Sequence, residues 1–293
     1  MYSCPVCKQA LNKDAADSLN AGSLRCEAGH NFDRHKKGYI NLLLAQNKKS
    51  KQPGDDSTMV DGRRAFLNAG YYQVFADKIA ELILAHKPQS ILDAGCGEGF
   101  YLNNIIAKTY EHANPSSLNN RLSINSSVSI NAYGFDISKP AIAAAASSYK
   151  NIEWAVASSA RAPYQTSVFD CILSVFSRVE SAEFARLLKI GGIVVYAGPG
   201  PNHLLALREL IYPEVNAYKS EKHADYFGEH FTLLNKTALT IPLSIKSNEQ
   251  MMNLLSMTPH SQRINKEAEN RLKTTQALND HADFLLYVYQ KTS

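Results

Sequence analysis

The sequence predicts an α/β protein with a doubly wound, mostly parallel sheet and a small metal-binding module at its N-terminal end. Three observations support this fold class. Short apolar runs alternate with helical stretches after residue 88, a glycine-rich turn follows the first of these runs, and four Cys and His residues with metal-ligand spacing lie within the first 30 positions. The alternation is typical of βαβ units, in which a helical crossover joins two parallel strands.

Length and composition favour one large domain with a smaller appendage. The chain has 293 residues, of which 45% are hydrophobic, and both values are ordinary for a globular protein. It contains no run of about 18 apolar residues, and its first residues, MYSCPVCK, lack the pattern of a signal peptide. We therefore expect a cytoplasmic protein that does not contact a membrane.

Positive charge is concentrated near the N-terminus. Residues 1–53 contain nine Lys or Arg against four Asp or Glu, an excess of +5, so the rest of the chain carries −1 of the total of +4 (4 minus 5). A basic module beside a nearly neutral domain indicates a polyanionic partner, although a solvated basic linker would give the same balance.

The first predicted unit, residues 1–45, contains a zinc-site pattern. Cys4 and Cys7 form a C-x2-C pair, and Cys26 and His30 follow with C-x3-H spacing. Thiolates and imidazole suit zinc, and four protein ligands close a tetrahedral site, which predicts structural Zn2+ rather than a catalytic ion. The alternative is a free-thiol pair beside an incidental histidine. Two further cysteines are expected in the sheet: Cys96 and Cys171.

The second predicted unit, residues 46–87, is a linker followed by a helical segment. The linker is KKSKQPGDDS at 48–57, and apolar residues then recur at spacings of three and four from 58 to 86. Two glycines and a Tyr pair near position 70 predict a break between two helices.

The third predicted unit, residues 88–293, is the large domain. Its predicted strands and helices follow one another as ILDAG, YLNNIIAKTY, NAYGFDI, AIAAAASSYK, IEWAVAS, FDCILSVF, EFARLLK and GGIVVYAGP. About 20 Asn- and Ser-rich residues at 112–131 predict a surface insertion. From Asn202 on, a predicted helix, HLLALRELIY, is mixed with polar stretches, and FLLYVYQK predicts a last strand.

The glycine turn is the main candidate ligand site. The pattern D-x-G-x-G-x-G follows the first predicted strand, where a parallel sheet binds ligands, and comprises Asp93, Gly95, Gly97 and Gly99. A Cβ at such positions would keep a ligand off the backbone. A pyrophosphate-binding turn would have its third glycine at position 100, which is Phe100. The spacing favours S-adenosylmethionine as the cofactor, with a different nucleotide as the alternative.

An acidic residue is expected to end the second strand and hold the ribose hydroxyls, roughly 20 residues after the glycines. The candidate is Asp136 in GFDIS, which lies 37 residues after Gly99. Removing the 20-residue insertion leaves about 17, which matches the expected spacing. Ser138 and Pro140 then predict the start of a helix.

These elements resemble class I methyltransferases, whose domain is Rossmann-like. Ser158 and Ser159 stand where that class has an acidic or polar pair after its third strand. FDCILSVF is similar to its fourth strand, and LKIGGIVVY is similar to its turn into the fifth.

A more specific resemblance runs through the chain in order. CPVC, CEAGHNFDRHKKGYINLL, PGD, RRAFLNAGYY, LDAGCGEG, ASS, GPGPNHL and LLSMTP are similar to the RlmA-type methyltransferases, which methylate guanine N1 in a hairpin of 23S ribosomal RNA. The resemblance covers almost the whole chain and leaves out mainly the insertion.

The resemblance implies zinc ligation by the four residues named above and a set of cofactor contacts. Those contacts are Tyr72, Gly97, Glu98 and His203, with Asp136 added by the wider class. Without the resemblance, Tyr72 would be a helix-packing residue and His203 a helix cap or a surface residue. The chain departs from the family at Ser177 and Arg178, where an Ala-Pro pair is expected to face the reacting group.

The implied reaction is an in-line displacement in which guanine N1 attacks the methyl group and the protein supplies alignment and a destination for the N1 proton. N1 lies inside the Watson-Crick pair, so the base must be unpaired or flipped. A basic stretch with interleaved aromatic residues is expected to hold RNA phosphates and stack a base. It comprises Arg34, Lys36, Lys37, Lys48, Lys49 and Lys51 with Phe32 and Tyr39.

The sequence is also compatible with two other functions. One is a small-molecule methyltransferase whose zinc knuckle serves only folding or dimerisation. The other is a non-catalytic RNA-binding factor that keeps the sheet. The predicted partner is 23S ribosomal RNA, and a homodimer is an open alternative for the assembly.

Overall fold

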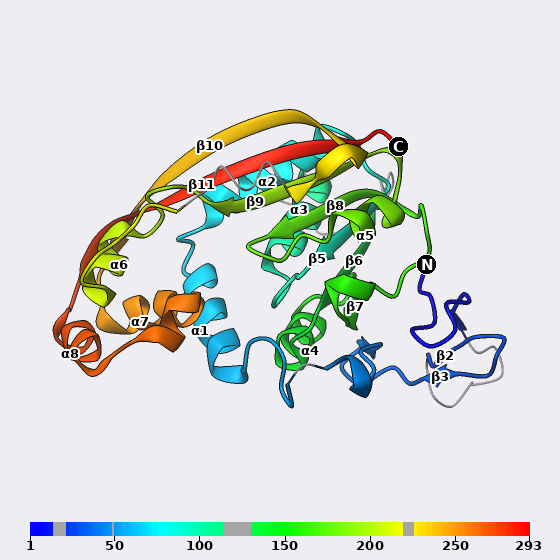
Figure 1. The fold of residues 1–293 in the computed structure, drawn as a ribbon, viewed down its shortest axis with the longest axis horizontal. Helices are drawn as coiled ribbons and strands as arrows, with labels where there is room; N and C mark the ends of the chain where they lie inside the picture. Colours follow the sequence, from blue (N-terminus) through cyan, green and yellow to red (C-terminus); the bar gives the residue numbers. More distant parts are fainter. Residues whose placement is uncertain (14–21, 49, 114–129, 219–225) are drawn as a thin grey trace.

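The computed structural model of the chain describes residues 1–13, 22–48, 50–113, 130–218 and 226–293. The predicted insertion at 112–131 lies mainly on 114–129, outside the described residues. Figure 1 shows one large sheet that carries helices on its faces, with the N-terminal module at one end and a group of C-terminal helices at the other.

The sheet has eight strands in the order β10-β11-β9-β8-β5-β6-β7-β4. Pairing is parallel from β9 through β4, and β11 is antiparallel to both β9 and β10. The strands are β4 (Ile40–Asn41), β5 (Ser90–Ala94), β6 (Asn131–Asp136), β7 (Glu153–Val156), β8 (Phe169–Val175), β9 (Leu188–Pro199), β10 (Phe231–Ile245) and β11 (Leu278–Lys291).

The switch point of this doubly wound sheet lies at β5, which pairs with β6 on one side and with β8 on the other. Strand order reverses there, and open α/β sheets bind ligands at the carboxyl ends of the strands beside such a point. All five residues of β5 are buried. The sheet therefore places the glycine turn that follows β5 at its ligand-binding edge.

Two hydrophobic cores cover the two faces of the sheet, and alternate residues along each strand enter different cores, as Ile91 and Leu92 do. One core contains residues of α2 (Gln73–Leu84), α3 (Phe100–Ala113) and α4 (Lys139–Ser148). The other contains residues of α5 (Ser181–Leu187) and of the N-terminal module.

The remaining helices gather away from the N-terminal module. α1 (Ser57–Asn68) packs against α4 and α7 (Asn248–Ser256), while α6 (Leu205–Ile211) packs against α8 (Lys266–Thr274) and β11 (Figure 1). Side chains cap the N-termini of several helices, as where Asp56 accepts from the amide of Met59 and Ser138 from that of Ala141. Short 3-10 turns complete the elements: 45–47, 159–161, 228–230 and 259–263.

The N-terminal module is built into the large domain. Its own small sheet consists of β1 (Asn12–Lys13), β2 (Leu24–Arg25) and β3 (Asn31–Phe32). Beyond it, β4 pairs in parallel with β7 and ends the large sheet. The Tyr2 ring stacks on Tyr164 at 5.1 Å, and Arg34 forms an ion pair with Glu153 at 2.8 Å. The module therefore shares a core, a sheet and a salt bridge with the domain beside it.

The alternating elements predicted after residue 88 are present, and the predicted helix break near residue 70 separates α1 from α2. The sequence did not predict β10, α7 or α8, which form in the stretches read as polar, nor the addition of β4 to the sheet. No helix among the described residues is long and apolar enough to cross a membrane.

Candidate functional site

The glycine turn is held by the end of the neighbouring strand β6. The amides of Gly95 and Cys96 both donate to the carbonyl oxygen of Phe135, at 2.9 and 3.0 Å. Gly95, Gly97 and Gly99 have φ values of +83°, +54° and +90°, a region that residues with a Cβ rarely adopt. Two hydrogen bonds thus anchor the backbone of this turn to the end of β6.

Packing also explains two of these glycines. A Cβ at Gly95 would come within 2.5 Å of the Ser177 Cβ, and one at Gly99 within 2.6 Å of the Trp154 ring. Ligand access alone therefore does not explain these two glycines, because protein atoms already occupy the space beside them. Only at Gly97 is the nearest atom the end of a flexible side chain, Arg63 Nη1 at 3.0 Å.

Asp136 ends β6, as predicted, and its carboxylate accepts two backbone hydrogen bonds. The Gly97 amide donates to Oδ2 at 3.0 Å and the Ser138 amide to Oδ1 at 2.7 Å. Burial raises the pKa of Asp136, while these two hydrogen bonds oppose the rise. Each oxygen retains acceptor capacity, so the carboxylate can also accept hydrogen bonds from ligand hydroxyl groups.

Two further acids lie at the turn. Asp93 is 1% exposed, and its Oδ2 has no hydrogen-bond partner among the described residues. Burial first, and then the charge of Asp136, raises the pKa of Asp93 well above its usual range. Glu98 is buried, which raises its pKa, and its Oε2 lies 3.7 Å from Arg64 Nε. A buried carboxyl oxygen without a partner is costly unless a ligand or water donates to it.

The two more distant predicted residues, Tyr72 and His203, meet at a phenylalanine that the sequence did not single out. The Phe284 ring of β11 lies 5.1 Å from each of their rings and stacks on Phe75 at 3.8 Å. Phe176, the residue after β8, lies 5.9 Å from Phe284 and 5.5 Å from His203. We call these five residues the aromatic cluster.

The aromatic cluster adjoins the glycine turn through Ser177. Its hydroxyl donates to the Ala94 carbonyl oxygen at 2.6 Å and lies 2.8 Å from the Ser174 hydroxyl. The Ser177 hydroxyl therefore joins the segment after β8 to the end of β5. Arg178 is mostly exposed and pairs with Glu180 at 2.7 Å.

His203 is a neutral imidazole with a defined tautomer. It is buried, and its Nδ1 lies 2.7 Å from the Asp283 carbonyl oxygen. A carbonyl can only accept, so Nδ1 carries the proton and Nε2 keeps its lone pair. Burial lowers the pKa of His203 to about 4, although the Asp283 carbonyl opposes the decrease.

This site fits S-adenosylmethionine. Asp136 offers acceptors for ribose hydroxyls, the unpartnered Asp93 oxygen suits a ligand donor, and the Gly97 backbone is shielded only by a movable side chain. The geometry thus brings together the predicted glycines with Asp93, Glu98 and Asp136, and gathers Tyr72 and His203 at Phe284. Their roles toward the cofactor are taken up below as proposals.

The four predicted zinc ligands form one cluster. The side-chain ligand atoms of Cys4, Cys7, Cys26 and His30 lie within 4.8 Å of one another. The Cys26 sulfur is 3.5 Å from that of Cys7 and 3.3 Å from His30 Nδ1. A tetrahedral zinc site with 2.3 Å Zn–S bonds needs sulfur separations of roughly 3.8 Å, so this donor set fits zinc.

Two tight turns form the cluster. Lys8, the residue after Cys7, and Gly29, the residue before His30, adopt positive φ values of +66° and +85°. The Lys8 amide donates to the Cys4 carbonyl oxygen, and the Gly29 amide donates to that of Cys26. Burial acts to raise the pKa of Cys26, but hydrogen bonds with His30, Cys7 and Cys4 lower it to about 6.

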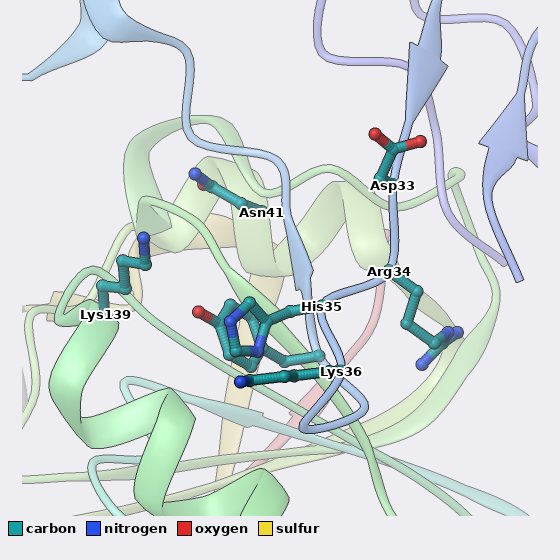
Figure 2. Close-up of a pocket in the computed structure, with 7 residues that line it drawn as sticks. Asp33, Arg34, His35, Lys36, Asn41 and Lys139 are labelled. Atoms are coloured by element: carbon teal, nitrogen blue, oxygen red, sulfur yellow. The ribbon is translucent and has the colours of Figure 1, made fainter. Parts of the chain in front are cut away.

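A basic pocket lies between the N-terminal module and α4. Two adjoining cavities of about 440 and 650 Å³ share His35, Lys36, Tyr39, Asn41 and Lys139 in their walls. Figure 2 shows His35, Lys36 and Asn41 facing Lys139 across the smaller cavity, with Arg34 directed away. The pocket is lined by five lysines that form no ion pair within the described residues: Lys36, Lys37, Lys48, Lys51 and Lys139.

The residues that line the pocket differ in part from the basic stretch predicted from the sequence. Tyr39 is 2% exposed and stacks on His35, so its ring packs in the core and has no free face for a base. Arg34 is engaged by Glu153, and Lys49 lies outside the described residues. Lys139, which comes from the large domain, completes the pocket and was missed because its position depends on the docking of the module.

Comparison with known proteins agrees with this architecture. The family model of a zinc ribbon described as "RlmA, N-terminal" matches residues 2–51. YxjB of Bacillus subtilis (strain 168), whose name proposes a 23S rRNA (guanine-N(1)-)-methyltransferase, is 33% identical over 220 residues, which are 73% of this chain and 70% of YxjB. The Streptomyces fradiae 23S rRNA (guanine(748)-N(1))-methyltransferase is 26% identical over 88% of this chain and 84% of its own.

Among solved structures, the YcgJ protein of Bacillus subtilis is similar with a TM-score of 0.45 and 15% identity, over 74% of this chain and 99% of that one. The fold and the site together define a class I, S-adenosylmethionine-dependent methyltransferase with an N-terminal zinc ribbon. Since the match with YxjB spans more than two thirds of both chains, the chain belongs to the RlmA family of methyltransferases.

The zinc cluster leads to a prediction on metal content. Cys26→Ser removes one of four ligands, so the zinc bound after gel filtration falls from about one ion per chain to a small fraction of that, measured by atomic absorption. Cys171→Ala, at a buried cysteine in β8 outside the cluster, keeps its zinc. Equal zinc in both variants would show that these residues do not hold the ion.

The lowered pKa of His203 leads to a prediction on stability. The unfolded chain takes up the proton near pH 6.5 and the folded chain only near pH 4, so folding stability falls as pH decreases through this window. The difference approaches about 3 kcal/mol at about 1.4 kcal/mol per pKa unit. In urea unfolding at several pH values, His203→Asn loses this part of the dependence, whereas His281→Asn, at an exposed histidine, retains it. Identical pH dependence in wild type and His203→Asn would contradict the assignment.

Proposed function

We propose that the chain transfers the methyl group of S-adenosylmethionine to N1 of a guanine in a hairpin of 23S ribosomal RNA. The observation that carries this proposal is that the basic pocket adjoins the cofactor site. The larger cavity is lined by Ile137, next to Asp136, and by Asp55, which pairs with Arg63 beside Gly97. A polyanion held in the pocket would thus lie next to the methyl donor. The names of YxjB and of the Streptomyces fradiae relative support RNA as that polyanion.

We propose a role for each predicted residue of the cofactor site. The backbone from Gly95 to Gly99 would receive the cofactor, Asp136 would accept from its ribose hydroxyls, and Glu98 and Asp93 would lie near its amino-acid end. Tyr72 and His203 would border the methyl group from the aromatic cluster. When bound, the cofactor supplies a methyl group on a sulfonium, which is electrophilic without any metal.

Phe176 is proposed to stack on the target base. Its ring is 43% exposed although it belongs to the aromatic cluster, and its φ of +50° is unfavourable for a residue with a Cβ. The residue follows β8 directly, at the ligand-binding edge of the sheet, and precedes Ser177. A flipped guanine on this ring would have the lone pair of His203 Nε2 nearby as a hydrogen-bond acceptor.

The basic pocket is proposed to hold RNA phosphates. Five lysines around one cavity would bind the backbone without reading its sequence, and the affinity would depend strongly on salt. Burial and the charges of Lys139, Lys36 and Lys37 lower the pKa of His35, which indicates a positive potential in the cavity. The division into units at residues 45 and 87 and the homodimer remain predictions.

Methyl transfer from labelled cofactor tests the proposal. With 23S RNA that lacks the modification, label is expected in the RNA, and reverse transcription is expected to stop at a guanine in one hairpin because N1-methylguanine cannot pair. Gly97→Arg, which fills the turn at a φ of +54°, is the inactive control. Label only in a panel of small acceptors would favour the small-molecule methyltransferase, and absence of cofactor binding would favour the non-catalytic factor.

Phe176 gives a second prediction. If the ring stacks on the base, Phe176→Ala lowers kcat/KM for RNA by about 5- to 150-fold, as expected from about 1–3 kcal/mol of base stacking, and leaves cofactor affinity nearly unchanged. Phe176→Tyr keeps most of the activity. Ile190→Ala, at an exposed residue near the opposite end of the sheet, is the matched control. An equal loss of cofactor affinity in Phe176→Ala would argue against base stacking.

A further inference from the structure

Arg63 of α1 lies against the glycine turn at Gly97. Its Nη1 is the atom nearest to a Cβ built on Gly97, at 3.0 Å. The side chain is only 22% exposed, and it forms an ion pair with Asp55 at 2.6 Å. Arg64, its neighbour in the chain, turns instead toward Glu98 and the Ser148 hydroxyl. The two arginines therefore face different groups, and Arg63 is the one against the turn.

The surroundings of Arg63 are acidic. Its charge lowers the pKa of Asp136 and, together with the larger effect of Arg64, that of Glu98, in both cases opposing the effect of burial. Asp93, the last but one residue of β5, is a further buried acid beside the turn. The amino-acid end of S-adenosylmethionine carries an ammonium group, which suits these acids, and a carboxylate, which they repel. A carboxylate at this turn needs a cation beside it.

We propose that Arg63 binds the α-carboxylate of the cofactor and gives up Asp55 to do so. This inference rests on the cofactor site described above. A guanidinium matches a carboxylate with two parallel hydrogen bonds, and Asp55 already presents such a carboxylate to it. In the structure Asp55 thus occupies the position on Arg63 that the cofactor carboxylate would take.

Asp55 belongs to the linker between the zinc module and α1, so the exchange would reach beyond the cofactor. A Cβ at Gly54 would come within 2.9 Å of the Ser138 amide nitrogen, and the Ser138 hydroxyl donates to the Asp55 carbonyl oxygen at 2.6 Å. The Asp55 residue also lines the basic pocket. Loading of the cofactor would therefore free one acidic side chain in the wall of the pocket proposed for RNA.

Calorimetry with two ligands that differ only in the carboxylate tests the proposal. The probes are S-adenosylmethionine and its decarboxylated form, titrated into the full, zinc-loaded protein. Wild type is expected to bind the complete cofactor more tightly. Arg63→Gln is expected to weaken the complete cofactor by about 30-fold or more, typical of a lost buried charge pair, and to leave the decarboxylated form within about threefold. Arg63→Lys is expected to recover part of the loss.

Two further variants complete the test. Arg64→Gln, one residue away on the same helix, is expected to keep the wild-type ratio of the two affinities. Asp55→Asn removes the competing carboxylate and is expected to tighten the complete cofactor. If Arg63→Gln lowers the affinity for both ligands equally, Arg63 only shapes the turn and does not bind the carboxylate. If Asp55→Asn weakens the complete cofactor, Asp55 holds Arg63 in place and the exchange is wrong. Binding of neither ligand to wild type would instead overturn the proposed function.

Discussion

The carboxylate of Asp136 is the group on which the site depends. It joins the amide of Gly97 in the glycine turn to the amide of Ser138 at the start of α4, and thereby fixes two turns that follow neighbouring strands. The linker packs on Ser138, and Arg63 is placed between the linker and the turn. Burial disfavours the charge of this carboxylate, and the two donors favour it. Its two hydrogen bonds thus connect the glycine turn with the start of α4, on which the linker packs.

Features set by neighbouring residues could be predicted from the sequence. The zinc ligands follow from two short spacings, and the parallel sheet follows from apolar runs separated by helical stretches. Asp136 was found because the register of a βαβ unit ties it to the glycine turn once the insertion is removed. In each case the signal lies within one element or between two that are adjacent in the fold.

Features that depend on packing between distant segments could not be predicted from the sequence. β10 is a partial exception, because its second half alternates apolar and polar residues from Leu239 to Ile245, whereas its first half is mostly exposed and shows no such pattern. β4 has only two residues and is a strand because β7 offers it an edge. Phe284 is an ordinary residue of a strand until Tyr72 and His203 pack on it from distant segments. In the sequence Arg63 looks like a surface residue of an amphipathic helix, and only the packing of α1 against α4 and α7 brings it to Gly97.

The pairing of β4 with β7 has a consequence for the behaviour of the chain in concentrated solution. Open strand edges recruit strands from other molecules, and proteins avoid this by covering or charging them. Here the cover is β4, which the zinc-stapled module holds in place with the Arg34–Glu153 ion pair beside it. If loss of the metal unfolded the module, the edge of β7 would be open to pairing with a strand of another molecule. The cysteines and histidine of the module would then protect a sheet edge that none of them touches.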